Sequence, residues 1–299
     1  MGQLRERMLE QISEHIWIKP HEEETDRPAL GYVYGGKTSL MVDSGNSPEH
    51  ISYFYGMVRS MGMPDPSFVV LTHWHWDHIF GLSGSPAKSI AHVLTNERLQ
   101  IMQRWDWSDS SLSSRVAAGI ETPFSAEMIR KEMPARHSFK VKPADISFEV
   151  QCIVRIDDIE CQLVHVGGPH SDDAIVVFVP QEKVLFLGDC ENVDQYNNSC
   201  MRLADLSALI LKLDQFDADI VVPSHRAPLS KSDFMKELIA LEKIGTAVGK
   251  TSDKALVPAL LKKELKRQPT EEELTDAEPF VIANQLSGKS LIDHHFLFK

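Results

Sequence analysis

The sequence predicts a mixed α/β protein, and three observations lead to this prediction. Short apolar segments rich in β-branched residues alternate with longer segments of helical periodicity along the 299 residues. A hydrophobic content of 42% is enough to bury a substantial core. Several apolar segments end directly in His or Asp, a pattern typical of a site at the edge of an α/β sheet.

The first part of the chain predicts a strand hairpin, a helix, a buried strand and a second helix. The pair Gly35-Gly36 suits the positive φ angles of a hairpin turn. Ser47 or Pro48 supplies a start signal for the first helix, and Gly62 ends it. The hairpin is expected at residues 30–43, the first helix at 48–61 and the buried strand at 67–72. The second helix is expected from about Thr95, where the segment carries a capping signal.

The pattern is weaker from about Trp105 to Pro143, where only residues 125–132 indicate a helix. Strands then return, separated by short turns, and a helix leads to one more apolar strand. The remainder is largely helical. These elements are expected at residues 146–156, 159–166, 174–180, 183–188, 202–216, 219–223, 256–266 and 271–276.

No internal repeat or low-complexity tract interrupts this order. We therefore divide the chain into an α/β domain, residues 1–230, and a helical C-terminal extension, residues 231–299, which packs on it.

The charge balance favours a small-molecule substrate. With 43 acidic and 31 basic residues, the formal net charge is −12, so we expect no broad cationic surface for nucleic acid or membrane lipids. Neither a signal peptide nor an apolar run of about 18 residues is recognisable. We expect a cytoplasmic protein.

The cysteines predict no disulfide scaffold. They show no C-x-x-C pairing and are expected to be reduced and buried, although Cys152 and Cys161 flank a predicted hairpin and could face one another across it. Cys190 is of interest because it follows Asp189, a candidate site residue.

The motif H-x-H-x-D-H directly follows the strand at residues 67–72. Spacing of two in an extended backbone sends His73 and His75 to the same side, where they can share one metal ion. Asp77 and His78, further on as the chain leaves the strand, are placed to reach a second ion a few Å away. We interpret the motif as part of a two-metal site.

Three further candidate ligands also stand where an apolar strand has just ended. They are His170, Asp189 and His225. Strand ends gathered at one edge of a sheet form the usual ligand crevice of α/β proteins. Together with the first four residues they complete two metal shells, with Asp189 as the expected bridge.

These motifs together resemble the metallo-β-lactamase superfamily, which includes glyoxalase II, lactonases and the zinc β-lactamases. The resemblance covers about residues 30–230 and rests on MVDSG with Asp43, HWHWDH, GGPHSDDAIVVFVP, FLGD with Asp189, and VVPSH with His225. It implies a four-layer αββα sandwich, here with a helical insertion and a helical C-terminal extension.

The resemblance also implies the roles of the site residues. Asp189 would bridge the two ions, and Asp43 would support the ligands from outside the metal shells. The first ion would take His73, His75 and His170, and the second Asp77, His78 and His225.

The sequence departs from the family pattern in three places. His165 precedes Gly-Gly-Pro and competes with His170 for the ligand role, but His170 adjoins the following strand as the motif requires. The long interval between His78 and His170 makes residues 98–145 a candidate lid. No lysine lies near FLGD, where zinc β-lactamases hold the drug carboxylate, and this disfavours a β-lactam substrate.

The predicted function is a dinuclear metal-dependent hydrolase. A hydroxide shared by two metal ions would attack an ester, thioester or lactone carbonyl of a small molecule. Asp77 is the candidate catalytic residue, since it would hold the hydroxide as well as the second ion. Imidazole and carboxylate ligands favour zinc and are also compatible with iron or manganese.

The candidate pocket residues come from two segments. Trp105 and Trp107, with Phe124, would wall the crevice from the lid, and Tyr196 and Arg202 follow Asp189 closely in sequence. For each of them, ordinary core packing or a solvated loop is the competing interpretation.

Other functions of the same fold stay open. They are an iron-dependent oxidoreductase such as a sulfur dioxygenase or a flavodiiron protein, a β-lactam or phosphodiester hydrolase, a nuclease, and a non-catalytic binding module. A flavodiiron protein is disfavoured by His75, where Glu is usual, and a nuclease by the acidic charge balance. A binding module is disfavoured because none of the ligands is missing.

Overall fold

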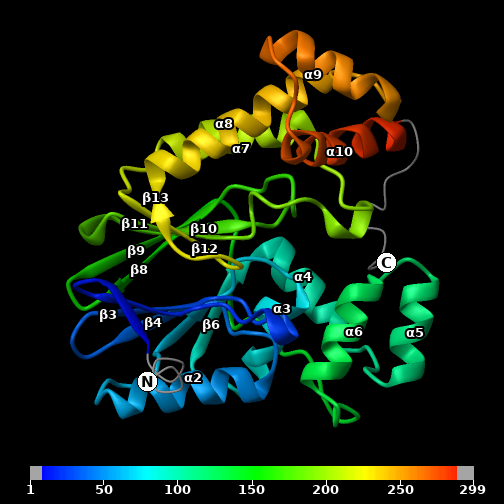
Figure 1. Ribbon diagram of the computed structural model, residues 1–299. Helices are drawn as coiled ribbons and strands as arrows, with labels where there is room; N and C mark the ends of the chain where they lie inside the picture. The colour runs from blue at the N-terminus through cyan, green and yellow to red at the C-terminus, as the bar shows by residue number, and fades with distance from the viewer. Residues whose placement is uncertain (1–8, 288–299) are drawn as a thin grey trace, which may run out of the picture.

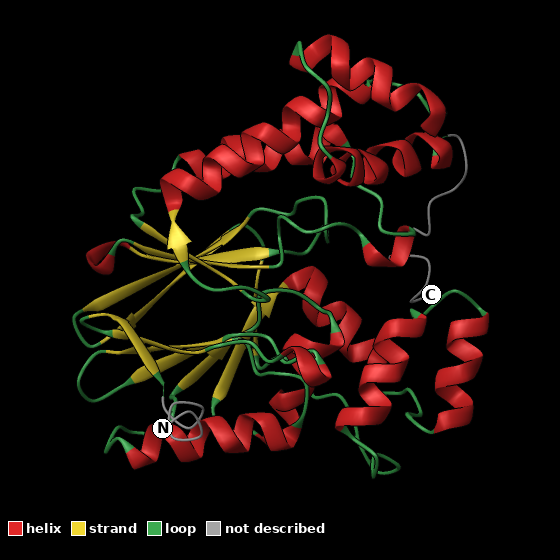
Figure 2. Ribbon diagram, in the orientation of Figure 1, coloured by secondary structure: helices red, strands yellow, loops and turns green. Residues whose placement is uncertain are grey.

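The computed structural model describes residues 9–287, and its architecture is a stack of two β-sheets covered on both outer faces by helices (Figures 1 and 2). The helix labelled α2 lies below the first sheet, while α7 and α8 lie above the second. The predicted four-layer αββα sandwich is confirmed. The outer ends of the two predicted parts, residues 1–8 and 288–299, lie outside the described residues.

The first sheet has seven strands within residues 9–287, in the order of the sequence. Its first four strands form antiparallel pairs, and β4, β5, β6 and β7 run parallel to one another. The strands are β1 Glu10–Ser13, β2 Ile16–Lys19, β3 Leu30–Tyr34, β4 Ser39–Val42, β5 Phe68–Val70, β6 Lys88–His92 and β7 Ile146–Phe148.

The second sheet has six strands in the order β13-β12-β11-β10-β9-β8. All neighbouring pairs are antiparallel except β11 and β12, which are parallel. The strands are β8 Gln151–Ile156, β9 Ile159–His165, β10 Ile175–Val179, β11 Val184–Gly188, β12 Ile220–Pro223 and β13 Leu229–Ser230.

The α-helices of the described chain are α2 Pro48–Ser60, α3 Trp76–Ile79, α4 Val93–Met102, α5 Asp109–Ala117, α6 Pro123–Glu132, α7 Leu203–Asp214, α8 Lys231–Val248, α9 Val257–Leu265 and α10 Glu271–Leu286. Short 3-10 helices are η1 Glu23–Thr25, η2 Phe80–Gly84, η3 Pro180–Glu182, η4 Gln195–Asn197 and η5 Lys254–Leu256.

Three apolar clusters hold the layers together. The middle cluster, with Val70 and Phe186, joins the facing sides of the two sheets. On the outer side of the first sheet, Phe54 of α2 packs with Tyr32 and Met41. On the outer side of the second sheet, Leu209 of α7 and Phe234 of α8 pack among Leu185 and Val221, and α9 and α10 extend the same cluster. Burial of apolar area on both faces of each sheet is the main force that fixes this order of layers.

The prediction of a single strand over residues 146–156 is wrong, because this segment forms two strands. β7 belongs to the first sheet and β8 to the second, so the chain changes sheets at Glu149 and Val150. Continuous apolar periodicity does not reveal such a bend, since both halves alternate in the same way.

Other elements also differ from the sequence prediction. β1 and β2 were not predicted. Helix α4 begins at Val93, two residues before Thr95, and its N-cap is His92, whose Nδ1 accepts a hydrogen bond from the Leu94 amide. The predicted C-terminal helix at 271–276 continues through Pro279 to Leu286.

The segment 98–145 is more ordered than its sequence indicated. It contains the unpredicted helix α5, which begins at the N-cap Ser108. Trp107, Leu112 and Ile129 are buried in the cluster outside the first sheet, and Arg136 Nε donates a hydrogen bond to the Trp107 carbonyl. Most of this segment's apolar side chains therefore serve packing rather than a solvent-facing cover.

The cysteines are free, and Cys161, Cys190 and Cys200 are buried. Across the β8-β9 hairpin, Cys152 lies opposite Leu163 and Cys161 opposite Val154, so the two thiols do not face one another. Among the helices of residues 9–287, none combines the length and the apolar composition needed to cross a membrane.

Candidate metal centre

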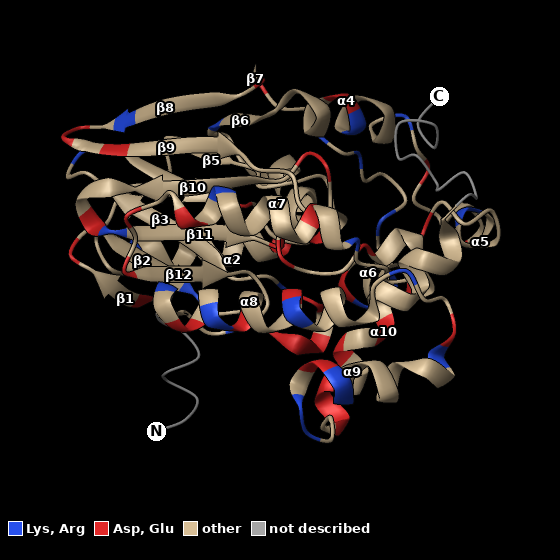
Figure 3. Ribbon diagram, turned by 90° about the horizontal axis from the view of Figure 1, so that it is seen from above, with Lys and Arg blue, Asp and Glu red and all other residues tan. Residues whose placement is uncertain are grey.

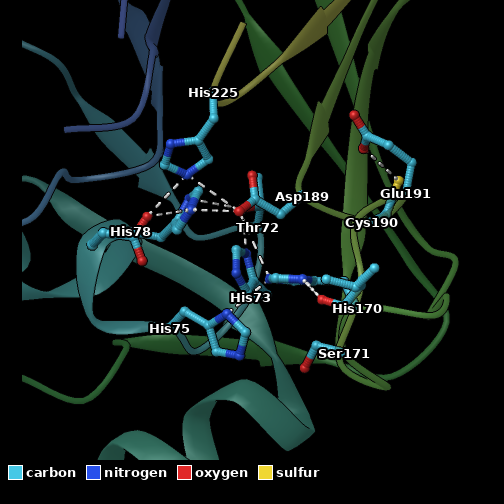
Figure 4. Close-up of polar contacts among 12 residues, drawn as sticks. Thr72, His73, His75, His78, His170, Ser171, Asp189, Cys190, Glu191 and His225 are labelled. Carbon is cyan, nitrogen blue, oxygen red and sulfur yellow. Dashed lines mark hydrogen bonds and ion pairs between the residues drawn. The ribbon is translucent and has the colours of Figure 1, made fainter. Parts of the chain in front are cut away.

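Five strand ends meet at one edge of the sandwich, of which four carry the candidate ligands and one carries Asp43. In the second sheet, β9, β11 and β12 point in the same direction, because β10 is antiparallel to both β9 and β11, and β11 is parallel to β12. Residues that follow these three strands and the parallel pair β4 and β5 therefore emerge at the same edge. Figure 4 shows side chains from both sheets turned toward one another there.

The first ligand group consists of His73, His75 and His170. One nitrogen of each imidazole lies within 4.8 Å of the others, and all three residues are buried. His75 Nδ1 and His170 Nε2 are 2.8 Å apart, while His170 Nδ1 donates to the Val193 carbonyl at 2.8 Å. That carbonyl fixes the ring of His170 so that its Nε2 faces His75, as Figure 4 shows.

The second ligand group consists of Asp77, His78, Asp189 and His225, whose ligand atoms also lie within 4.8 Å of one another. Asp77 Oδ2 is 3.0 Å from His78 Nε2 and 3.1 Å from His225 Nε2. Asp189 Oδ2 is 3.2 Å from His225 Nε2 and 3.7 Å from His170 Nε2. Asp189 thus lies between the two groups.

The protonation of the first group suits a cation. Burial, followed by the nearby imidazoles His78 and His170, lowers the pKa of His73 well below its usual value. Burial and the same kind of repulsion lower the pKa of His75. The two rings are therefore neutral, which is the form that coordinates a metal. Within residues 9–287, His73 Nε2 is buried and has no hydrogen-bond partner.

The second group combines carboxylates with imidazolium ions. Despite burial, His225 and then His78 hold the pKa of Asp189 well below its usual value. Burial opposes charge on His78 as well, but Asp77 and Asp43 raise its pKa well above the usual value. In the metal-free chain, protons on the imidazoles thus compensate the carboxylates, and a divalent cation could replace those protons. Asp189 Oδ1 is buried without a hydrogen-bond partner among the described residues, so both groups fit a metal ion.

Asp43 contacts His78 of the second group directly and is held in place by Thr72, a residue that sequence reasoning missed. Thr72 donates to both oxygens of Asp43, from its amide at 2.7 Å and from its hydroxyl at 2.9 Å. The same hydroxyl lies 3.1 Å from His73 Nδ1. Thr72 therefore ties Asp43 to both ligand groups. Its position directly before the HWHWDH run was the only available signal.

Two glycines let the ligand loops approach one another. Gly188, which precedes Asp189, has φ 58°, and a Cβ there would lie 2.7 Å from the side chain of Thr72. Gly168, near His170, has φ 128°, and its Cβ would lie 2.5 Å from the Cys190 carbonyl. A side chain at either position would separate the strand ends that carry the ligands.

A cavity of about 650 Å³ opens onto both groups. Its apolar wall comes from helices α6, α8 and α10 and from the loop after Asp189. In Figure 1, α6 lies below and α10 above the sheet edge that carries the ligands. The lining residues besides the candidate ligands are His21, Glu23, Asp26, Trp76, Phe124, Ser125, Glu191, Asn192, Val193, Gln195, Tyr196, Met201, Leu241, Thr275, Asp276 and Pro279.

The predicted pocket residues divide into two sets. Tyr196 lines the cavity, and its ring packs 5.0 Å from that of His75. Trp105, Trp107 and Arg202 lie outside this lining, which corrects the expectation for them. Trp107 is in the core, and the guanidinium of Arg115 lies over the rings of both tryptophans. Arg202 pairs with Asp205 and lines other cavities.

His165 and Cys190 are outside both groups. His165 Nε2 donates to the Asp172 carbonyl at 2.7 Å, and its ring stacks on His92 with centroids 3.9 Å apart. Cys190 is buried in the cluster outside the second sheet, and burial raises the pKa of its thiol well above the usual value. A buried, protonated thiol is a poor ligand and a poor nucleophile.

Sequence reasoning also missed two carboxylates beside the site. Asp26 Oδ1 lies 3.5 Å from His225 Nδ1, and burial, followed by repulsion from Asp77, raises the pKa of Asp26 to about 7. Glu121 is buried and accepts a hydrogen bond from the Tyr196 hydroxyl at 3.0 Å, and burial raises its pKa to about 7. Neither residue lies in a recognisable motif.

Known proteins with similar sequences are distant relatives. The beta-lactamase-like protein 2 homolog of Caenorhabditis elegans is 24% identical over 189 residues, which cover 59% of this chain and 52% of that protein. The chain thus spans about half the length of that relative. The acyl-coenzyme A thioesterase MBLAC2 of Gallus gallus is 25% identical over 238 residues, 70% of this chain and 76% of that protein.

Solved structures share the fold. A metallo-beta-lactamase from Pontibacter korlensis superposes with a TM-score of 0.56 at 19% identity, covering 79% of this chain and 98% of that one. A metallo-beta-lactamase family protein from Thermus thermophilus gives a TM-score of 0.57 at 16% identity and covers 93% and 94% of the two chains. The family profile described as Metallo-beta-lactamase superfamily matches residues 25–225. The chain therefore belongs to the metallo-beta-lactamase superfamily.

Proposed function

We propose that the protein is a dinuclear metal-dependent hydrolase of a small-molecule thioester, ester or lactone, with zinc as the metal. The observation that carries this proposal is the pair of adjacent, buried ligand groups that both face one cavity. His73, His75 and His170 would hold the first ion, and Asp77, His78 and His225 the second. Asp189 would contact both, because it lies between the groups.

Two divalent ions in these groups would supply a water of lowered pKa and stabilise negative charge on a carbonyl oxygen. The chain supplies the rest. Asp77 lines the cavity and is placed to hold a proton of the attacking water. The cavity walls exclude bulk water from the carbonyl and position the acyl group. The Val193 carbonyl and Asp43 keep the imidazoles in the orientation that coordination requires.

A thioester is our first choice of substrate. The Gallus gallus relative is named an acyl-coenzyme A thioesterase, and this chain matches 76% of its length. The apolar wall of Phe124, Met201 and Leu241 suits an acyl chain. In the loop after Asp189, Glu191 and Asn192 rather than a lysine line the cavity. This loop therefore favours a substrate that needs no cationic side chain to bind a carboxylate.

The test is turnover by the zinc-loaded protein of a thioester, an ester, a lactone, a β-lactam and a phosphodiester. Iron-loaded and manganese-loaded samples run in parallel. Asp77→Asn is the variant expected to be inactive, and Asp217→Asn is its matched control. Asp217 is exposed and precedes β12, so it lies at the end of this strand that is opposite to the candidate metal centre. Turnover of a carbonyl substrate that Asp77→Asn abolishes and Asp217→Asn retains supports the proposal. Equal rates for both variants would reject it.

A further inference from the structure

We propose that the cavity selects substrates whose acyl group is neutral or positively charged and rejects those with a carboxylate on the acyl group. This inference rests on the proposed hydrolase function and specifies its substrate class. The charge and the packing of the cavity wall carry it.

The cavity wall is acidic. Six of its lining residues are Asp or Glu, and within residues 9–287 no Lys or Arg lines it. Asp77 and Asp189 are candidate ligands, so bound cations would offset their charge. Four carboxylates then remain, namely Glu23, Asp26, Glu191 and Asp276.

Glu23 and Asp276 determine the charge of the outer wall. Asp26 Oδ1 lies 3.5 Å from His225 Nδ1, and Glu191 is two residues from Asp189, so both carboxyls belong to the immediate surroundings of the candidate ligands. Glu23 is exposed and Asp276 is half-buried, and within residues 9–287 neither belongs to one of the two ligand groups. The inference therefore depends on these two side chains and not on the groups beside the metals.

Each arginine that directly follows a lining residue in sequence is paired with an acid, and Arg202 Nη1 lies 3.4 Å from Asp205. Arg27 Nη2 lies 2.8 Å from Glu132 and its Nη1 3.1 Å from Glu22. Arg226 Nη1 lies 2.7 Å from Glu237. None of these guanidinium groups lines the cavity, so none is positioned to bind a substrate carboxylate there.

Helix α10 strengthens the acidic character of the wall. Its sequence EEELTDAEPFVIANQL contains no Lys or Arg, and it presents Thr275, Asp276 and Pro279 to the cavity. By contrast, basic and acidic segments alternate along α8 (Figure 3). An acyl carboxylate beside this helix would meet like charges without a Lys or Arg side chain to compensate them, a penalty that a neutral or cationic group avoids.

The experiment uses three thioesters with the same neutral thiol, N-acetylcysteamine. Their acyl groups are 6,6-dimethylheptanoyl, which is neutral, 5-(trimethylammonio)pentanoyl, which is its cationic isostere, and adipoyl, which is anionic. The zinc-loaded chain should hydrolyse the anionic thioester with a kcat/KM at least about tenfold below that of the neutral one. The cationic thioester should equal or exceed the neutral one.

A charge reversal on α10 tests the assignment. Asp276→Lys should raise the anionic-to-neutral ratio of kcat/KM by about tenfold. The matched control is Glu264→Lys, an exposed residue of α9 outside the cavity lining, which makes the same change in net charge and should leave the ratio unchanged.

A binding measurement separates this inference from the proposed hydrolysis. Calorimetry with the three corresponding ketones, in which a methylene group replaces the sulfur, should give the same order of affinities. If the ketones bind in that order but no thioester is cleaved, the selectivity stands and the proposed function fails. If the anionic ketone binds as tightly as the neutral one, or if Glu264→Lys shifts the ratio as much as Asp276→Lys, the selectivity is wrong.

Discussion

Asp43 Oδ2 lies 2.8 Å from Nδ1 of His78, and both side chains are almost completely buried. Asp43 adopts φ 60°, a left-handed conformation that Asp and Asn tolerate better than other side chains. Because its carboxylate accepts the Nδ1 proton, the Nε2 of His78 is left facing Asp77 and Asp189. One carboxylate thus fixes the rotamer of a candidate ligand, and it would keep the proton on Nδ1 when a metal ion replaces the proton on Nε2.

Asp43→Asn should weaken the second metal site selectively. An amide retains the backbone conformation and can accept the hydrogen bond from the Thr72 amide, but the NH2 group that then replaces Oδ2 cannot accept a hydrogen bond from His78 Nδ1. We expect the affinity for the second equivalent of zinc to fall about 10-fold to 100-fold while the first is retained. Competitive titration with a chromophoric chelator measures both. An equal loss of both equivalents would contradict the separate role of Asp43.

The chain should contain about two metal ions after reconstitution and dialysis, because two complete ligand groups are present. Removal of the metal leaves the ionisable side chains of the second group next to one another without a cation. Metal binding also stabilises the folded state and not the unfolded state. We expect chelation to lower Tm by roughly 10 °C. Elemental analysis and differential scanning calorimetry test this. Less than half an equivalent of any transition metal per chain would exclude the metal centre.

Asp77→Asn should lower turnover at least about a hundredfold and leave the fold intact, since the variant removes a charge from the second group and a proton acceptor from the cavity. Circular dichroism should match the parent chain. If turnover and metal content are both unchanged, Asp77 has only a structural role.

The sequence predicted the candidate ligands because each one lies a few residues after an apolar strand, and strands that run in the same direction bring such positions to the same edge. It did not predict Thr72 or Glu121, which contact Asp43 and Tyr196 from segments distant in sequence. Trp107 was misassigned to the cavity for a related reason. An aromatic residue in an irregular segment has no periodicity that distinguishes a core position from a pocket wall.

Glu121→Gln should stabilise the protein above neutral pH. Burial raises the pKa of Glu121 from 4.5 to about 7, so the folded chain holds a proton that the unfolded chain releases between these values. The free energy of unfolding therefore falls as pH rises from about 4.5 to 7, by up to about 3 kcal/mol, and Gln removes this dependence.

The Gln oxygen can still accept the hydrogen bond from Tyr196, so packing should be preserved. Urea denaturation at pH 5 and pH 8 gives the difference between the variant and the parent. It should be small at pH 5 and large at pH 8, and a difference independent of pH would show that Glu121 is ionised in both states.

Phe124 and Trp107 lie in the same segment, but Ala substitution should affect substrate binding at Phe124 and stability at Trp107. Phe124 has 48% of its surface exposed and lines the cavity, whereas Trp107 has 1% exposed and packs against Phe80 with ring centroids 4.6 Å apart. Phe124→Ala removes a contact that ground state and transition state share. We expect KM for an apolar thioester to rise about fivefold with kcat retained, and stability to change by less than about 1 kcal/mol.

Trp107→Ala leaves a large void in the cluster outside the first sheet, and should cost about 3 to 5 kcal/mol of unfolding free energy. Because no candidate ligand lies within residues 98–145, the folded fraction should keep its metal content and KM. Urea denaturation and steady-state kinetics on both variants separate the two roles. If Trp107→Ala instead raises KM without loss of stability, this tryptophan reaches the substrate, and the residues that form the wall of the cavity must be reassigned.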